Sequence, residues 1–216
     1  MIKKPIISFV TLFLIFTLVG CGEKLEPTYI EPININFNVA DINNQTISFQ
    51  YPTDDWQQKD SFNPDIIKVL LYGKNENLDP TTNITIGSTS TSQNLTLEDY
   101  VKLIPEHLEK SSPGTKVSVA ELRKVNDIVF SYLEMKTKVT EEDLEYGLQK
   151  GIFTEETIKA KGGKEAFLNQ PEVKQIQMSV SFQDKITNIT ATYSDNREKE
   201  IILKAMLTMV QTATLL

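Results

Sequence analysis

Apolar and polar residues alternate along most of the chain beyond residue 43, a pattern typical of β-strands with one buried face. The clearest case is residues 174–182, where every second residue from Ile176 to Phe182 is apolar and the residues between are glutamine or serine. Further strands are expected at residues 46–51, 66–72, 83–90, 116–125, 128–138 and 186–193. Short turns such as Asn126-Asp127 join several of them, so neighbouring strands are predicted to pair antiparallel.

Two amphipathic segments predict helices that pack on this sheet. Thr96 and Asp99 have the spacing of a capping box, and apolar residues then recur every three or four positions. Pro105 lies inside this segment and is expected to bend or tighten the helix. The second helix is expected to begin near residues 194–195, and its apolar stripe indicates core packing. Helices placed around an antiparallel sheet predict an α+β fold.

A helical insertion is expected at residues 140–170, before the last strand pair. Two short units there open with Thr-Glu-Glu, at residues 140–142 and 154–156. Threonine is a good N-cap, and glutamates in a first turn suit the helix dipole. The insertion either covers a sheet edge against pairing with other chains or acts as a lid that binds a partner or gates a ligand. The candidate binding surface combines it with the single tryptophan: Trp56, Glu141, Glu142, Phe153 and Glu155.

The first 20 residues have the pattern of a bacterial signal peptide. Lys3 and Lys4 precede an apolar run that ends at Gly20 and Cys21. The uncharged stretch, residues 5–20, has 16 residues, whereas a helix that spans a membrane needs roughly 20. An uncleaved anchor helix and an ordinary secretory signal that ends near a cysteine are the alternatives.

The sequence Leu-Val-Gly-Cys at residues 18–21 resembles the lipobox of bacterial lipoproteins. The resemblance implies cleavage between Gly20 and Cys21 and attachment of a diacylglycerol, with fatty acids such as palmitate, to the Cys21 sulfur. Two acyl chains are enough for stable membrane attachment. The expected location is therefore the extracytoplasmic face of the cell membrane, held by a lipid anchor.

The mature chain divides into a tether and a body. Residues 21–43, with two prolines and several asparagines, are predicted to be the tether, and residues 44–216 the folded domain. Within the tether, residues 33–39 alternate apolar residues with asparagines, as a half-buried strand would. Whether they form a strand stays open at this point.

Charge and cysteine content narrow the classes of partner. The chain has 22 basic and 29 acidic residues, and cleavage after Gly20 removes two lysines, which leaves a net charge of −9. An acidic body argues against nucleic acid as a partner and against lying flat on anionic lipid. The single cysteine is assigned to lipid, so no disulfide is available and the fold must depend on its core.

Residues able to support catalysis are scarce. His107 is the only histidine, and no Gly-x-Ser-x-Gly segment occurs. A common zinc site needs several cysteines or histidines, and the acidic runs lack the spacing of a calcium loop. The sequence therefore predicts no catalytic residues, no metal site and no cofactor, and the protein is not expected to be an enzyme.

The order of segments resembles the PsbP-like family, named for an extrinsic protein of photosystem II, and its lipid-anchored relatives in Gram-positive bacteria. The resemblance rests on Ile-Ser-Phe-Gln-Tyr-Pro at residues 47–52, Trp56, Leu-Glu-Asp-Tyr-Val at residues 97–101, and the final strand pair and helix. It implies an α/β/α sandwich that binds other proteins, here as a non-enzymatic accessory module of the cell envelope. A small-ligand or cation-binding lipoprotein and a hydrolase are the alternative functions.

Overall fold

The computed structural model describes residues 24–44, 47–60, 69–90, 95–149, 151, 154–182 and 185–216. The predicted signal peptide, residues 1–20, lies outside these ranges, as do Cys21 and Phe153. The lipobox therefore stays a prediction.

The described strands form two sheets. The main sheet has the order β1-β7-β8-β9-β10-β6-β5-β4, and a small sheet has the order β11-β3-β2. The main sheet contains β1 (Thr28–Tyr29), β4 (Trp56–Lys59), β5 (Val69–Gly73), β6 (Asn83–Ser90), β7 (Thr115–Val125), β8 (Ile128–Thr137), β9 (Val173–Phe182) and β10 (Lys185–Tyr193). The small sheet contains β2 (Val39–Asn44), β3 (Ile47–Pro52) and β11 (Thr214–Leu215). Every described pairing is antiparallel except that of β1 with β7.

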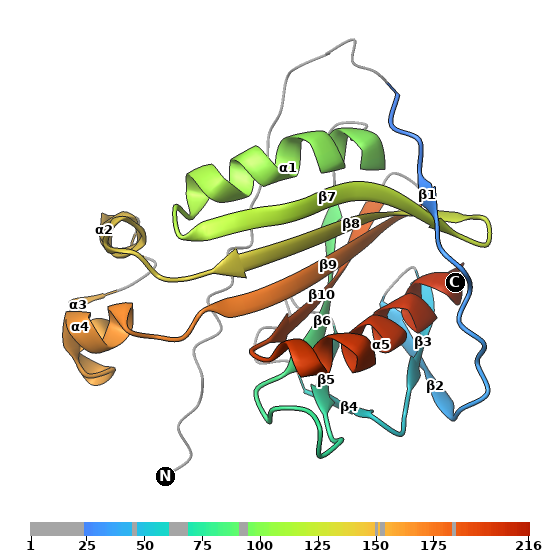
Figure 1. Cartoon of the computed structure of the whole chain (residues 1–216), viewed down its shortest axis with the longest axis horizontal. Coiled ribbons are helices and arrows are strands. Elements are labelled where there is room, and N and C mark those ends of the chain that lie inside the picture. The colour runs from blue at the N-terminus through green and yellow to red at the C-terminus, as the bar shows by residue number, and fades with distance from the viewer. Residues whose placement is uncertain are drawn as a thin grey trace.

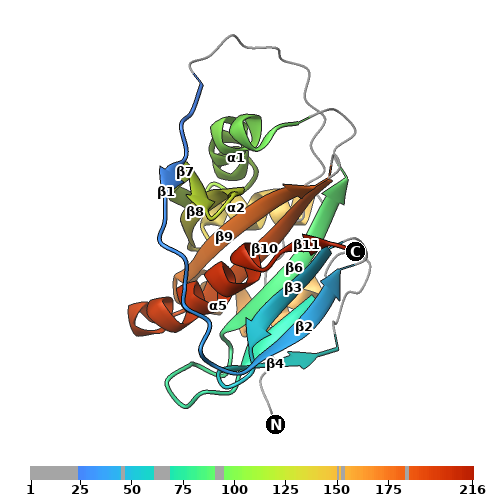
Figure 2. The same cartoon turned by 90° about the vertical axis from the view of Figure 1, so that its right-hand side faces the viewer.

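Helices lie on both faces of the main sheet, as predicted (Figures 1 and 2). The described helices are α1 (Leu97–Ser111), α2 (Glu141–Gln149), α3 (Glu155–Ala160), α4 (Gly163–Leu168) and α5 (Lys199–Gln211). Helix α1 packs on β7 and β8 from one side, and α5 packs with the small sheet on the other. The predicted α+β class, with a sheet between helices, is confirmed.

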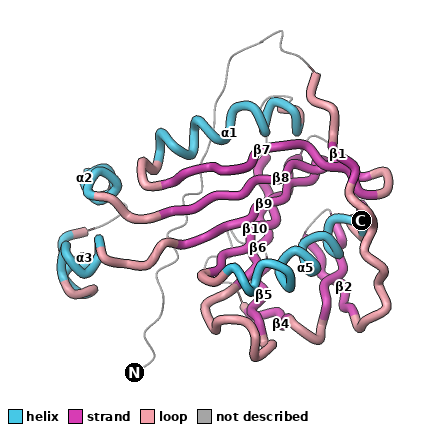
Figure 3. Tube along the Cα trace, in the orientation of Figure 1, coloured by secondary structure: helices cyan, strands magenta, loops and turns pink. Residues whose placement is uncertain are grey.

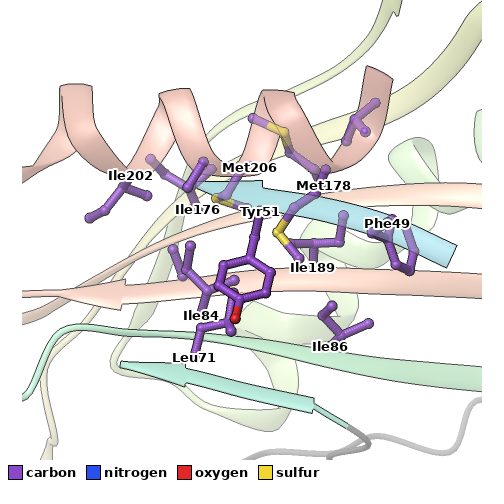
Figure 4. Close-up of a cluster of buried hydrophobic side chains, with 14 of the residues drawn as sticks. Phe49, Tyr51, Leu71, Ile84, Ile86, Ile176, Met178, Ile189, Ile202 and Met206 are labelled. Carbon is purple, nitrogen blue, oxygen red and sulfur yellow. The ribbon is translucent and has the colours of Figure 1, made fainter. Parts of the chain in front are cut away.

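The main core fills the layer between the main sheet, α5 and the small sheet (Figure 4). Ile176 and Met178 of β9 and Ile189 of β10 are fully buried there with Ile202 and Met206 of α5. Side chains on one face of a strand recur every second residue, which is why the alternation at residues 174–182 identified this face. A smaller cluster holds α1 to the opposite face of the sheet.

The capping box predicted at Thr96 and Asp99 is present, and the structure shows a second one that was not predicted. Thr96 accepts a hydrogen bond from the Asp99 backbone N–H, and the Asp99 side chain accepts one in return from the Thr96 backbone. Asp195 and Glu198 make the same exchange in the 3₁₀ turn Asn196–Glu198 that leads into α5. Side-chain oxygens thus satisfy N–H groups that a helix start leaves without partners.

The predicted tether needs correction, because most of its described part is bonded to the body. The Leu25 backbone N–H donates to Glu98 of α1 at 3.0 Å. Thr28–Tyr29 then pairs with β7 as β1, and the Ile30 N–H donates to the Lys124 carbonyl at 2.8 Å. We call residues 25–38 the strap. The chain beyond it, from residue 39, is already β2, so the folded body begins well before residue 44.

The strap is held to the end of α5 by one side chain. The Gln211 amide donates to the Ile33 carbonyl at 2.8 Å and accepts from the Ile33 N–H at 2.9 Å. Further along, the Lys204 ammonium lies 4.0 Å from the centre of the Phe37 ring. Residues 33–38 are not a strand, although their apolar residues are half-buried and their asparagines exposed. The alternation correctly indicated which residues are half-buried. The backbone at Ile33, however, is hydrogen-bonded by the side-chain amide of Gln211 and not by a neighbouring strand.

Gln211→Ala should loosen the strap without disturbing the core. The variant loses both hydrogen bonds to Ile33, which we expect to lower the free energy of unfolding by about 1–2 kcal/mol. Hydrogen exchange at the Ile33 amide should become at least tenfold faster while amides of β9 keep their protection. Gln57→Ala, at an exposed position on β4, is the control. Unchanged exchange at Ile33 would contradict the role given to Gln211.

Candidate binding groove

A groove of about 330 Å³ opens where β8 ends and β9 begins, beside the start of α5. This volume is at the lower end of the range for ligand sites. The lining residues come from four strands, the 3₁₀ turn and α5: Ser118, Glu134, Met135, Lys136, Lys174, Tyr193, Asn196 and Lys199. Ser118 lies at an irregularity in β7, where the pairing with β8 shifts register between Val117 and Val119.

Glu134 is the carboxylate among the groove residues, and it is fully engaged. Both of its oxygens accept hydrogen bonds from the Lys199 ammonium, each at 2.8 Å, and one also accepts from the Tyr132 hydroxyl. The Glu134 side chain is 23% exposed and the Lys199 side chain 34%. This pair therefore fixes the start of α5 against β8 and leaves little of the carboxylate for a ligand.

Burial and hydrogen bonding act against each other on the pKa of Glu134. Burial alone raises the pKa, but the hydrogen bonds from Lys199 and Tyr132 outweigh it and hold the pKa below the ordinary value. The pKa of Tyr132 is raised, first by burial and then by its hydrogen bond to Glu134. Burial and the Glu134 charge also raise the pKa of Tyr193. At neutral pH the groove thus contains an ionised carboxylate and neutral phenols.

Arg123 supports this network from the neighbouring strand. Its guanidinium carbon lies 3.4 Å from the centre of the Tyr132 ring, and its Nη2 atom is 2.6 Å from Glu121 Oε1. A cation over an aromatic ring at this distance attracts the electron-rich face. Tyr132 is therefore held by Arg123 over the face of its ring and by the hydrogen bond from its hydroxyl to Glu134.

Three lysines lie side by side across the strands, and two of them, Lys136 and Lys174, line the groove. Lys116 of β7 pairs directly with Lys136 of β8, and Lys136 pairs with Lys174 of β9. We call these three residues the lysine row. Tyr193 of β10 is the next residue along it, since it pairs with Lys174. Like charges directly opposite each other on neighbouring strands destabilise a sheet, so this arrangement is not explained by stability.

The lysine row is only weakly neutralised. Lys136 lies 3.5 Å from Glu172, and both side chains are exposed, at 54% and 42%. Solvent screening makes such an exposed pair worth little. Lys174 donates to the neutral Asn196 amide oxygen at 3.1 Å. Because Glu134 is engaged by Lys199, the groove margin keeps a positive charge on a protein whose net charge is negative.

The insertion lies beyond the end of β8 and the start of β9 (Figure 3), which is also where the groove opens. Helices α2, α3 and α4 join β8 to β9, which are neighbours inside the main sheet, whereas β1 and β4 end the described strand order. The hypothesis that the insertion covers a sheet edge stays untested, because β1 pairs with only two residues of β7 and Asp143 of α2 accepts a hydrogen bond from the Gly114 N–H just before β7. The insertion has its own small core, formed by Leu144, Ile158 and Phe167. Its possible role as a lid stays a hypothesis.

The predicted binding residues are not brought together into one surface. Trp56 is only 1% exposed and belongs to the main core, so it does not form part of a binding surface. Glu141 and Glu142 lie exposed in the first turn of α2, and Glu155 lies exposed in the first turn of α3. Glu141 is 3.4 Å from Lys164. These glutamates act as helix-start residues, which is the simpler interpretation of Thr-Glu-Glu.

The groove residues were missed because their signal depends on strand register. Each of the three lysines is an ordinary charged residue near the end of a predicted strand. Only the pairing of β7, β8 and β9 shows that the three lie opposite one another. A correct register for the predicted strands would have been needed to find the row.

Within the described ranges, no three side chains among histidine, cysteine, aspartate and glutamate gather as metal ligands would. None of the helices in that part of the chain has the length and apolar character needed to cross a membrane.

Comparisons with known proteins report on the fold. No family model matches the sequence, and no curated protein does. The Ran-binding protein Mog1p of Saccharomyces cerevisiae has 8% identity and a TM-score of 0.51, covering 83% of this chain and 96% of its own. At that identity the likeness shows a shared fold and nothing of activity.

Two further solved structures are similar at slightly lower scores. Cyanobacterial PsbP from Synechocystis sp. PCC 6803 has 13% identity and a TM-score of 0.49, over 92% of this chain and 99% of that one. LpqN, described as involved in cell envelope biogenesis of Mycobacterium tuberculosis, has 13% identity and a TM-score of 0.48, over 83% and 91%. The solved structures similar to this chain thus include a PsbP, from the family that the sequence resembles.

Glu134→Gln should destabilise the protein at neutral pH and much less in acid. Because the pKa of Glu134 is lower in the folded than in the unfolded state, its stabilising effect is complete above the unfolded pKa of about 4.3 and is lost as the pH falls through the folded pKa. We expect a loss of about 1–2 kcal/mol at pH 7, limited by solvent around Lys199.

Urea unfolding at pH 7 and pH 3 measures this difference. Glu145→Gln, at an exposed position on α2, should change stability by less than about 0.5 kcal/mol at either pH. An equal loss from Glu134→Gln at both pH values would show that its charge is not what stabilises the groove.

Proposed function

We propose that this protein is a lipid-anchored, non-enzymatic module of the cell envelope that binds another envelope protein at its groove. The observation that supports this most is the placement of two features at opposite ends of the main sheet. The strap meets the sheet beside the β7–β8 turn, where Thr28 pairs with Arg123. The groove lies at the far end of β8, at Lys136.

The separation of the two ends follows from strand geometry. Residue 130, which pairs with Arg123, and Lys136 are six positions apart on β8. At about 3.3 Å per residue, the groove lies about 20 Å along the sheet from the strap. The insertion is at the groove end as well, so both surfaces with unassigned roles lie away from the strap (Figure 1).

If Cys21 carries a lipid, the strap would restrict how the body is oriented relative to the membrane. Only residues 22–24 separate Cys21 from Leu25, whose N–H is bonded to Glu98. Four consecutive Cα–Cα steps reach at most about 14 Å. In this proposal the strap end stays close to the membrane and the groove is held out from it, where a partner can reach it.

Labelling and crosslinking in cells test this proposal. With an alkyne fatty acid, the wild-type protein should take up label and Cys21→Ser should not. A photocrosslinking amino acid at Ser118, on the groove, should give a discrete crosslinked product with another protein. The same amino acid at Asp127, a fully exposed position near the strap, is the matched control.

Absence of label from the wild type would contradict the lipid anchor. Equal crosslinking from Ser118 and Asp127, or none from Ser118, would contradict a partner at the groove.

A further inference from the structure

The lysine row lowers the stability of the sheet through repulsion between like charges, and nothing in the fold requires this arrangement. Lys116, Lys136 and Lys174 are directly opposed on three neighbouring strands, where their like charges repel. Lys199 adds a fourth ammonium at the groove, and Glu134 is its bonded partner. A positive strip on an acidic protein is best matched by a negative ligand, whose binding would relieve the repulsion.

We propose that the groove binds an extended acidic peptide segment, with the lysine row pairing to its carboxylates. The proposal rests on the proposed function and names the chemistry of the partner. Neighbouring strands are about 4.8 Å apart, so the three lysine positions extend over about 10 Å. A chain with several carboxylates matches a row of this length, whereas a single small anion engages only part of it.

Two other features favour a peptide over a lipid headgroup. The groove is about 20 Å along the sheet from the strap. The membrane that would hold the strap therefore lies at the opposite end of the domain, and its lipid headgroups would not reach the groove. The groove also contains the Tyr193 ring and the neutral Asn196 amide beside the ammonium groups. A peptide offers apolar and amide groups for these neighbours as well as carboxylates for the lysines.

Fluorescence anisotropy with a labelled octaglutamate peptide and the full-length chain in detergent tests the proposal. We expect saturable binding that weakens as salt rises from 50 to 300 mM, and no binding of octaglutamine. Lys174→Glu should raise Kd at least tenfold. Lys185→Glu is the matched control. It makes the same change at an exposed site at the start of β10, the end of that strand away from the groove, and should alter Kd less than twofold.

Thermal unfolding separates a binding role from a structural one. Lys174→Glu places a carboxylate opposite Lys136 on one side and Tyr193 on the other. Because it replaces a repulsion by an attraction, Tm should stay unchanged or rise by about 1–3 °C while binding is lost. Lys136→Gln, which only removes a charge, should weaken binding several-fold with an unchanged Tm. A Tm lowered by more than about 4 °C in Lys174→Glu would show that the row stabilises the fold and would overturn the proposal.

The other probes decide the chemistry. Unchanged octaglutamate binding in Lys174→Glu would overturn the proposal, as would binding to inorganic phosphate or to anionic phospholipid vesicles without binding to octaglutamate. The assay needs neither the lipid anchor nor a cellular partner. Failure of cell labelling with intact octaglutamate binding would therefore reject the anchor and leave the groove assignment standing.

Discussion

The apolar layer between the main sheet, α5 and the small sheet holds every other part of the molecule in position. Its side chains, such as Met178 and Met206, are fully buried, and burial of each side chain of this size contributes roughly 1.5–3 kcal/mol. Because this layer fixes α5 against β8, β9 and β10, it also fixes Lys199 over Glu134 and opens the groove beside them. The strap depends on the same layer, since Gln211 is at the end of α5.

The strap and the groove give the domain two distinct ends. A flexible tether would let the body rotate freely, but a chain bonded at Leu25, Ile30 and Ile33 transmits the position of its N-terminal end to the whole domain. A short link between an anchor and a rigid body limits where a binding site can point. The charge pattern is consistent with this division, because the positive strip lies at the end away from the strap while the protein as a whole is acidic.

Much of the fold could be predicted from the sequence because its signals are local. The alternation at residues 174–182, the capping pair Thr96 and Asp99, and the helical insertion each depend on residues a few positions apart. The strap was missed because its partners are distant in sequence: Gln211 is 178 residues from Ile33. The groove was missed for the same reason, since opposed lysines are visible only once the strand register is known. Trp56 is a core residue and not a binding residue, because burying a large ring stabilises the fold more than leaving it exposed on the surface.

The orientation of the lipidated protein on a membrane tests the central claim most directly. The chain has one cysteine, Cys21, which the lipid would occupy, so a new cysteine can carry a single fluorophore. Energy transfer to acceptor lipids would be measured in vesicles for Asp127→Cys, at the strap end, and for Ser118→Cys, at the groove. The account predicts strong transfer from position 127 and clearly weaker transfer from position 118. Equal transfer from both, or stronger transfer from position 118, would contradict a body held with its groove away from the membrane.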